Sequence, residues 1–393
     1  MTDPLALLVL GGGPAGLSAA GAYRDAGGEG AVAIVSDESR MPYSRPLLSK
    51  ELLRGEATED ELALEDEDWL AAHDVSLIAG RAMALDAGGR EVTLAGGRRL
   101  TYATCLVATG AEPTRLPVPG ADDPAVRVLR SLDDLRELQA RLAATGDGEH
   151  DVIVIGSGFI GCEIAASLRR RNLAVTLISD EAAPNRRRLG ARAGGELARW
   201  LSDEGVTLAL GAGVEAIERR PDGMRVQAGD LSVTAAVVVM AAGVTPRGEL
   251  AAAAGADLAG GAITVDSAMR SSLPGVLAAG DVCLADNAAA GRPLRVEHWG
   301  DALGQGAVAG ATAAGRVSVW DAVPGFWSTI GSRTLKYAAW GDGYDAERFE
   351  PGAGESFAVW YGRDGRLAGV LTHDADDRYE RGRELIAEGA PWG

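Results

Sequence analysis

Two stretches of the chain share the same order of apolar and polar positions. Residues 5–20 read LALLVLGGGPAGLSAA, and residues 151–166 read DVIVIGSGFIGCEIAA. Each starts as an apolar run typical of a buried strand, passes through the spacing Gly-x-Gly-x-x-Gly and continues with the Ala- and Leu-rich pattern of a helix. A second apolar run then ends in Ser-Asp-Glu in both halves, within residues 31–39 and 174–182. The pattern predicts a strand–helix–strand unit in each half of the chain.

The rest of the chain extends these two units and adds a third region. Each half later reaches a strand that ends in small residues, CLVATGAEP at 105–113 and VVVMAAGVTP at 237–246. Residues 327–343 and 356–372 alternate like strands around glycine-rich turns, and residues 384–389 read as a helix. We therefore predict an α/β fold with two Rossmann-like dinucleotide-binding domains and a small α+β C-terminal domain. The expected boundaries are residues 1–114 with 244–316 for the first, 115–243 for the second and 317–393 for the third.

The two glycine motifs indicate two dinucleotide sites. In such a motif the first glycine permits a tight turn, the second lets the backbone approach a pyrophosphate, and the third permits close packing of helix on strand. One such motif is weak evidence in a chain with 54 glycines, but two in the same strand-to-helix context are strong evidence. The economical pair of ligands is FAD with NAD(P)H, because a flavin accepts a hydride and releases electrons singly. The six glycines are Gly11, Gly13 and Gly16, and Gly156, Gly158 and Gly161.

The composition of the chain argues against some classes of binding partner. The chain has 38 Lys and Arg against 56 Asp and Glu, a formal net charge of −18, which argues against binding to nucleic acid. Its apolar runs are far shorter than the ~20 residues that a bilayer requires, and its N-terminus lacks the features of a signal peptide. We expect a cytoplasmic protein with no membrane contact. Cys105, Cys162 and Cys283 are far apart in the sequence and form no CxxC, so we predict neither a dithiol redox centre nor a metal site.

Three further segments carry a resemblance to a known family. They are MPYSRPLLSKELL at 41–53, VEHWGDALGQGAVAG at 296–310 and PGFWSTIG at 324–331. Together with the glycine motifs they resemble the FAD/NAD(P)H two-dinucleotide-fold flavoproteins, over about residues 5–315. Within that superfamily the Arg-Pro-x-x-Ser-Lys pattern is similar to the ferredoxin reductases of Rieske oxygenases and bacterial cytochrome monooxygenases, and to apoptosis-inducing factor. The redox cysteine that disulfide reductases carry in this region is missing, which argues against a thiol relay.

The resemblance implies a set of FAD contacts. A helix from about Trp299 would direct its positive end at the flavin pyrimidine. Asp281 has a second interpretation from the residues alone, as an N-cap after a glycine turn. His298 is expected to be a surface neighbour rather than an acid–base group. Trp299 and Trp327 are plausible aromatic walls of the flavin pocket, and the alternative is that they are core or interface residues. The implied FAD residues are Gly11, Gly13, Pro14, Ala15, Gly16, Asp37, Glu38, Arg45, Pro46, Thr109, Gly110, Gly280, Asp281, Glu297, His298, Trp299, Ala302 and Trp327.

Lys50 and Glu163 are the candidate catalytic residues. The chain has only two lysines, Lys50 and Lys336, and a lysine supplies a compact ammonium that arginine cannot imitate. In the resembling proteins a lysine at this position pairs with a glutamate at the position of Glu163, beside the flavin N5 where the hydride arrives. The alternative is a solvated lysine at a helix start and a first-turn acid favoured by the helix dipole.

The NAD(P)H side departs from the usual pattern. Members that prefer NADH often end the second strand with an acid that binds the adenosine ribose, but Ser179 stands there and Asp180 follows. Arginines at 186–188 could bind a 2′-phosphate or could form a solvated turn. The choice between NADH and NADPH therefore stays open, with a slight preference for NADH. The implied NAD(P)H residues are Gly156, Gly158, Phe159, Ile160, Gly161, Glu163, Ser179, Asp180, Arg187, Arg188 and Gly243.

The expected activity is electron transfer from NAD(P)H through FAD to a ferredoxin-type iron–sulfur protein. Two alternatives remain: a reductase of a small molecule or of oxygen, and an NADH-sensing flavoprotein like apoptosis-inducing factor. The C-terminal region is of the kind that forms an interface, so a homodimer is one expectation. The arginine clusters at 169–171 and 186–188 could dock an acidic ferredoxin against the acidic background. The acidic run at 59–68 is expected to be a solvated helix face.

Overall fold

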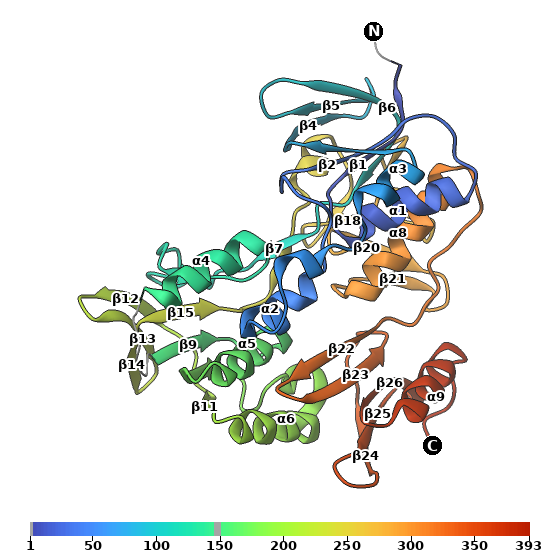
Figure 1. The fold of residues 1–393 in the computed structure, drawn as a ribbon. Helices are drawn as coiled ribbons and strands as arrows, with labels where there is room; N and C mark the ends of the chain where they lie inside the picture. The colour runs from blue at the N-terminus through green and yellow to red at the C-terminus, as the bar shows by residue number, and fades with distance from the viewer. Residues whose placement is uncertain (1–2, 145–150) are drawn as a thin grey trace.

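The computed structural model describes residues 3–144 and 151–393. Residues 1–2 and 145–150, which the predicted domain ranges include, lie outside the described residues. The α/β fold class predicted from the sequence is confirmed, with two parallel-stranded regions and a separate antiparallel sheet (Figure 1). Among the described residues, no helix combines the length and the apolar character that crossing a bilayer requires.

The first sheet contains the first glycine turn. Its parallel strands are β3, β2, β1, β6 and β19, and the antiparallel β5 and β4 extend it beyond β6. Helices α1 and α8 pack beside each other against it (Figure 1). The bounds are β1 Leu5–Leu10, α1 Pro14–Asp25, β2 Val32–Ser36, β3 Val75–Ala79, β4 Ala82–Asp86, β5 Glu91–Leu94, β6 Arg99–Val107, β19 Val276–Ala278 and α8 Trp299–Ala313.

The second sheet contains the second glycine turn and is parallel throughout. Its strand order is β11-β10-β9-β15-β8. The short strands β7 and β16 pair with each other where the chain passes between the two sheets. The bounds are β7 Ala111–Pro113, β8 Val126–Arg127, α4 Leu132–Ala143, β9 Asp151–Ile155, α5 Phe159–Arg170, β10 Ala174–Ser179, α6 Arg186–Asp203, β11 Thr207–Leu210, β15 Val237–Met240 and β16 Val244–Pro246.

Smaller sheets fill the remaining chain. An antiparallel sheet, β12-β13-β14, follows β11, and a four-stranded sheet, β17-β18-β20-β21, precedes α8. Their bounds are β12 Ala216–Arg220, β13 Gly223–Ala228, β14 Leu231–Ala235, α7 Glu249–Ala253, β17 Leu258–Ala259, β18 Ala262–Val265, β20 Cys283–Asn287 and β21 Arg292–Leu294. The segment after β2 forms the 3₁₀ helix η1 Arg45–Ser49 and the short helix α2 Glu51–Arg54.

The C-terminal region is one antiparallel sheet with a helix. The strand order is β22-β23-β26-β25-β24, and α9 packs on β23 and β26. The bounds are β22 Gly325–Ile330, β23 Arg333–Ala339, β24 Ala346–Pro351, β25 Phe357–Arg363, β26 Arg366–His373 and α9 Asp376–Ala387. The helix expected at 384–389 is the end of α9, which begins much earlier, and β24 was not predicted. Charged residues dominate the first turns of α9 and hide its helical periodicity.

The acidic run at 59–68 is not one helix face. Glu59–Leu62 form the 3₁₀ helix η2, and α3 begins at Glu67 and ends at Ala72. Asp66 caps α3, because its carboxylate accepts a hydrogen bond from the backbone N–H of Trp69 at 2.8 Å. The expectation of a single helix was therefore wrong, since a cap residue inside the run starts a new helix.

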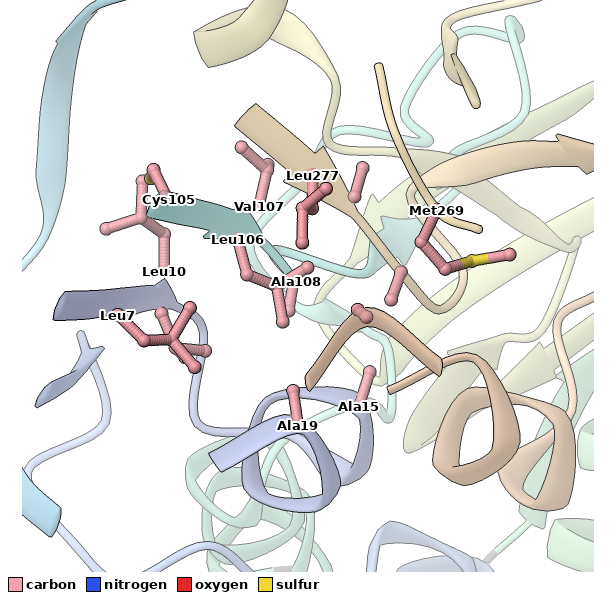
Figure 2. Close-up of a cluster of buried hydrophobic side chains, with 14 of the residues drawn as sticks. Leu7, Leu10, Ala15, Ala19, Cys105, Leu106, Val107, Ala108, Met269 and Leu277 are labelled. Carbon is pink, nitrogen blue, oxygen red and sulfur yellow. The ribbon is translucent and has the colours of Figure 1, made fainter. Parts of the chain in front are cut away.

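Close packing of α1 on α8 depends on two glycines. A Cβ on Gly306 would lie 2.3 Å from the carbonyl oxygen of Ala15, and a Cβ on Gly310 would lie 2.2 Å from that of Ala19. Figure 2 shows Ala15 and Ala19 on α1 facing the buried side chains of the first sheet, such as Leu106. These glycines let the two helix backbones approach more closely than any side chain permits.

A second hydrophobic cluster joins three parts of the chain. Trp200 of α6 is fully buried, and it packs with Phe357 of β25 and His373 of β26. The same cluster contains Leu53 of α2 and Ile164 of α5. The C-terminal sheet therefore shares one hydrophobic core with the helices of the second sheet.

Candidate functional site

One cavity of about 1800 Å³ collects the residues that the sequence singled out. It opens between the carboxyl ends of the two parallel sheets, where ligands of open α/β sheets bind. Every predicted FAD and NAD(P)H residue lines it except Gly16 and Gly161. The start of α8, together with Phe326 and Trp327 of β22, also lines the cavity.

The two glycine turns have the same geometry. Gly11 and Gly156 have φ angles of 129° and 105°, and a Cβ on either would meet a backbone carbonyl, of Ala108 at 2.1 Å or of Ala241 at 2.3 Å. Backbone of this kind favours glycine. In both turns the second glycine borders the open cavity, with no atom within 4 Å of its Cβ position.

The third glycine of each motif serves packing instead. A Cβ on Gly16 would lie 2.1 Å from the carbonyl oxygen of Gly11, and a Cβ on Gly161 would lie 2.0 Å from that of Gly156. This explains why Gly16 and Gly161 do not line the cavity, and it agrees with the packing role expected for the third glycine.

The helices α1, α5 and α8 begin at the cavity without a side-chain cap. Their N-cap residues are Gly13, Gly158 and His298. Their first N–H groups have no intrahelical partner, so they suit phosphate oxygens or developing negative charge. The second glycine of each motif has no side chain to block the approach of a ligand. Together with the free N–H groups, these glycines fit the pyrophosphates of FAD and NAD(P)H.

Near the first glycine turn, Glu38 and Arg45 form an ion pair. The hydroxyl of Tyr43 donates to Glu38 at 2.5 Å and accepts from the backbone N–H of Leu132 at 2.9 Å. Burial, followed by the effect of Glu38, raises the pKa of Tyr43 well above its usual range, despite the opposing Arg45 charge. Glu38 is thus occupied by protein partners, and Asp37 is the exposed acid of the Ser-Asp-Glu segment at this end.

Arg130 is a site residue that no sequence pattern predicted. Its guanidinium donates to the carboxylate of Asp281 at 2.7 Å, and both residues line the cavity. Its backbone carbonyl accepts a hydrogen bond from Arg45 at 2.7 Å. Arg130 lies just before the N-cap Ser131 of α4, and no local pattern there indicates a contact with Asp281.

Lys50 and Glu163 form a buried ion pair at the cavity wall. Lys50 Nζ lies 2.7 Å from Glu163 Oε2, and the two residues are only 6% and 3% exposed. Ser49 Oγ donates to the same oxygen at 2.5 Å, and Ser328 Oγ donates to Glu163 Oε1 at 2.7 Å. The alternative of a solvated lysine is therefore wrong, and every carboxylate oxygen of the pair has a donor.

Aromatic side chains line the same cavity as this pair. The rings of Phe159 and Phe326 meet edge to face with centroids 4.5 Å apart, and His298 lies 4.5 Å from Phe326 on another side. His298 Nδ1 also lies 3.2 Å from Asp301 Oδ2. Trp327 is 48% exposed, so it lies at the cavity rim rather than in a core.

At the second glycine turn, the hydroxyl of Ser157 donates to the hydroxyl oxygen of the buried Ser179 at 2.7 Å. Asp180 forms an ion pair with Arg187 at 2.6 Å, and Glu181 accepts a hydrogen bond from the backbone N–H of Arg187 at 2.8 Å. The arginines at 186–188 are exposed, as the solvated alternative expected, but they form the first turn of α6. Asp180 therefore pairs with one of the arginines that could bind a 2′-phosphate.

The three cysteines are separate and buried. Burial raises the pKa of Cys283 to about 12, and it raises those of Cys105 and Cys162 further. A thiol of this kind is a poor nucleophile, because the thiolate is the reactive form. Among the described residues, no group of His, Cys, Asp and Glu could hold a metal ion.

Comparisons with known proteins agree with this geometry. The model of the pyridine nucleotide-disulphide oxidoreductase family matches residues 5–306. Rhodocoxin reductase of Rhodococcus erythropolis is 30% identical over 98% of this chain and 90% of its own length. The ferredoxin reductase subunit of 5,5'-dehydrodivanillate O-demethylase of Sphingobium sp. (strain NBRC 103272 / SYK-6) is 35% identical over 97% of this chain and 93% of its own. In the covalent complex of putidaredoxin reductase with putidaredoxin, one chain matches with a TM-score of 0.91 and 29% identity, over 98% of this chain and 93% of that chain.

Proposed function

The chain belongs to the pyridine nucleotide-disulphide oxidoreductase family, and from this premise we propose that it carries electrons from NAD(P)H through FAD to a ferredoxin-type iron–sulfur protein. The observation that supports the proposal most directly is the shared cavity, where two equivalent glycine turns face one buried ion pair, Lys50 and Glu163. FAD supplies the chemistry that joins the two partners, since it accepts a hydride and releases electrons singly.

We assign the first glycine turn to FAD and the second to NAD(P)H. The FAD-binding domain then comprises residues 1–114 and 244–316, the NAD(P)H-binding domain residues 115–243, and the C-terminal domain residues 317–393. The pairing of β7 with β16 supports this division, because it lies where the chain leaves and re-enters the first sheet. Asp37 and Asp281 are the acids placed to accept hydrogen bonds from the sugar hydroxyls of FAD.

The side chains of the cavity have separate tasks in this proposal. The N-terminal amides of α1 and α5 bind phosphate, and those of α8 stabilise negative charge at the flavin. Phe159 and Phe326 exclude water from the space in front of Lys50, which strengthens electrostatic interactions there. Lys50 holds a fixed positive charge at the cavity wall, balanced by Glu163.

Three observations bear on the electron acceptor. The buried, separate cysteines disfavour a dithiol relay, so electrons must leave by another route. Trp327 offers an exposed aromatic surface at the cavity rim, where an acceptor protein can approach. Relatives that are named as ferredoxin reductases support an iron–sulfur protein as acceptor. We place the reaction in the cytoplasm, where NADH is available.

The test is steady-state consumption of NADH and NADPH by the FAD-loaded protein in air. It is measured with and without a bacterial ferredoxin coupled to cytochrome c. We expect strong stimulation by the ferredoxin. Rapid consumption in air with no effect of ferredoxin would instead support the small-molecule or oxygen reductase, and negligible turnover with a persistent NADH complex would support the sensor.

A further inference from the structure

Ser328 brings the C-terminal sheet into contact with the buried ion pair. It lies in β22, is 1% exposed, and donates from Oγ to Glu163 Oε1 at 2.7 Å. The other carboxylate oxygen, Oε2, already receives Lys50 at 2.7 Å and Ser49 at 2.5 Å. We propose that Ser328 is a positioning residue, which fixes the orientation of Glu163 and thereby the ion pair that Glu163 makes with Lys50.

The hydrogen bonds leave the carboxylate of Glu163 a single orientation. Among the described residues, Ser328 is the one donor on Oε1, and Glu163 is the one acceptor of the Ser328 hydroxyl. Rotation of the carboxylate would break the contacts of both oxygens inside a buried site. A buried charged acceptor that loses its donor is strongly disfavoured, so the Ser328 hydroxyl holds the group in place.

The internal repeat shows that this arrangement is specific to the second half. Glu163 occupies the position in α5 that Ser18 occupies in α1, at the same distance from the first glycine of its turn. Ser18 makes a simple hydrogen bond to the carbonyl of Leu303. In the second half of the chain, the carboxylate of Glu163 stands in place of this hydroxyl. It accepts hydrogen bonds from Ser49 and Lys50 of one segment and from Ser328 of another.

The partner segments are themselves fixed against α5. Ser167, which follows Glu163 by about one helical turn, donates to the backbone carbonyl of Ser49 at 2.8 Å. Phe326, on the same strand as Ser328, packs edge to face on Phe159 at the start of α5. The hydroxyl of Ser328 therefore meets Glu163 across a rigid contact between β22 and α5, rather than from a mobile loop.

The inference rests on the proposed binding of FAD in this cavity, which Ser49, Lys50 and Glu163 line. In a Ser328→Ala variant, Glu163 turns away from Lys50. This change leaves the positive charge of Lys50 less balanced at the cavity, which stabilises the reduced, more negative flavin. We expect bound FAD to have a more positive midpoint potential, and its anaerobic reduction by NADH to slow about tenfold as Lys50 loses its alignment.

Thr329→Val is the matched control. Thr329 is the next residue of β22 and points to the opposite face, where its hydroxyl contacts the hydroxyl of Thr334 at 2.9 Å. This variant loses a hydroxyl contact on the same strand without touching Glu163. It is expected to keep the wild-type potential and reduction rate. FAD stoichiometry and melting temperature are measured for both variants, so that a loss of fold is recognised.

A double-mutant cycle tests whether Ser328 acts through Glu163. In a Glu163→Gln background, Ser328→Ala should leave the potential unchanged, because the charge that it positions is gone. If Ser328→Ala does not hold FAD, the near-isosteric pair Ser328→Thr and Ser328→Val replaces it, and only Thr should keep the wild-type potential. The inference about Ser328 would be overturned if Ser328→Ala left the midpoint potential of FAD unchanged. It would also be overturned if Ser328→Ala shifted that potential equally in the wild-type and Glu163→Gln backgrounds. Neither result would contradict the proposed function. A wild-type protein that binds FAD but is not reduced by NADH or NADPH would overturn the proposed function together with the inference.

Discussion

At the scale of single residues, the nucleotide preference depends on which partner Arg187 has. Asp180 pairs with its guanidinium, and both side chains are largely exposed, so the pair can exchange for a ligand phosphate. We predict that Asp180→Ala frees Arg187 for bidentate contact with a 2′-phosphate and raises the ratio of kcat/KM for NADPH over NADH about tenfold. The ratio is measured by steady-state reduction of an artificial acceptor. The double variant Asp180→Ala/Arg187→Ala should return the ratio to the wild-type value, and an unchanged ratio in the single variant would contradict the prediction.

The same scale shows what the sequence could predict about the site. Lys50 and Glu163 were predicted as a pair because each belongs to a short motif that resembles a known pattern, and the structure places them 2.7 Å apart. Arg130 and Ser328 each bond to a predicted site residue, yet no sequence pattern assigned either of them to the site. Their partners, Asp281 and Glu163, are more than 150 residues away in sequence, so only the packing of separate segments makes these contacts visible.

At the scale of elements, α8 is fixed by the small residues that face α1. A Cβ on Gly310 would lie 2.2 Å from the carbonyl oxygen of Ala19 and 2.9 Å from the backbone nitrogen of Tyr23, and backbone atoms cannot move aside singly. We predict that Gly310→Ala lowers the free energy of unfolding by about 1–3 kcal/mol, as overpacking does. Gly304→Ala is the control, since no atom lies within 4 Å of its Cβ position. Because position 304 is exposed, this variant should be neutral or should stabilise α8 by up to about 1 kcal/mol. Equal urea midpoints for the two variants would contradict the prediction.

A second contact between elements depends on pH. Glu204, at the end of α6, accepts two hydrogen bonds of 2.9 Å from Arg170 at the end of α5, and the bond from Arg170 lowers the pKa of Glu204. A lowered pKa in the folded state stabilises the fold above the unfolded value near 4.5, and the contribution is lost as the pH falls through the lowered pKa. We predict that Glu204→Gln costs about 1 kcal/mol at pH 7 and progressively less below pH 4, measured by urea unfolding. A cost that is constant from pH 7 to pH 3 would contradict it.

The apolar periodicity of the sequence predicted some helices and strands correctly and missed others. The strands and helices around both glycine turns were predicted because apolar runs and glycine spacing are local signals. The start of α9 and the strand β24 were not, because their sequences are rich in charged residues and take their structure from the sheet beneath them. The acidic run at 59–68 was misassigned for a related reason, since a cap at Asp66 decides where α3 begins.

At the scale of the whole molecule, Trp200 couples the C-terminal sheet to the helices of the second sheet. It belongs to α6, is fully buried, and contacts Phe357 and His373 of the C-terminal sheet. We predict that Trp200→Ala costs about 3–5 kcal/mol and loosens both sides of the contact together. Hydrogen exchange measured by mass spectrometry should then rise in α6 and in β25 and β26.

Trp360 provides the comparison for this prediction. It is also buried, but it lies in the cluster between the C-terminal sheet and α9, away from α6. Trp360→Ala should therefore raise exchange in the C-terminal sheet and α9 while α6 keeps its protection. If the effect of Trp200→Ala stayed within α6, the C-terminal sheet would be an independent unit. In that case, the contact between Phe159 and Phe326 alone would have to hold β22 against α5. That contact would then be what keeps Ser328 beside Glu163.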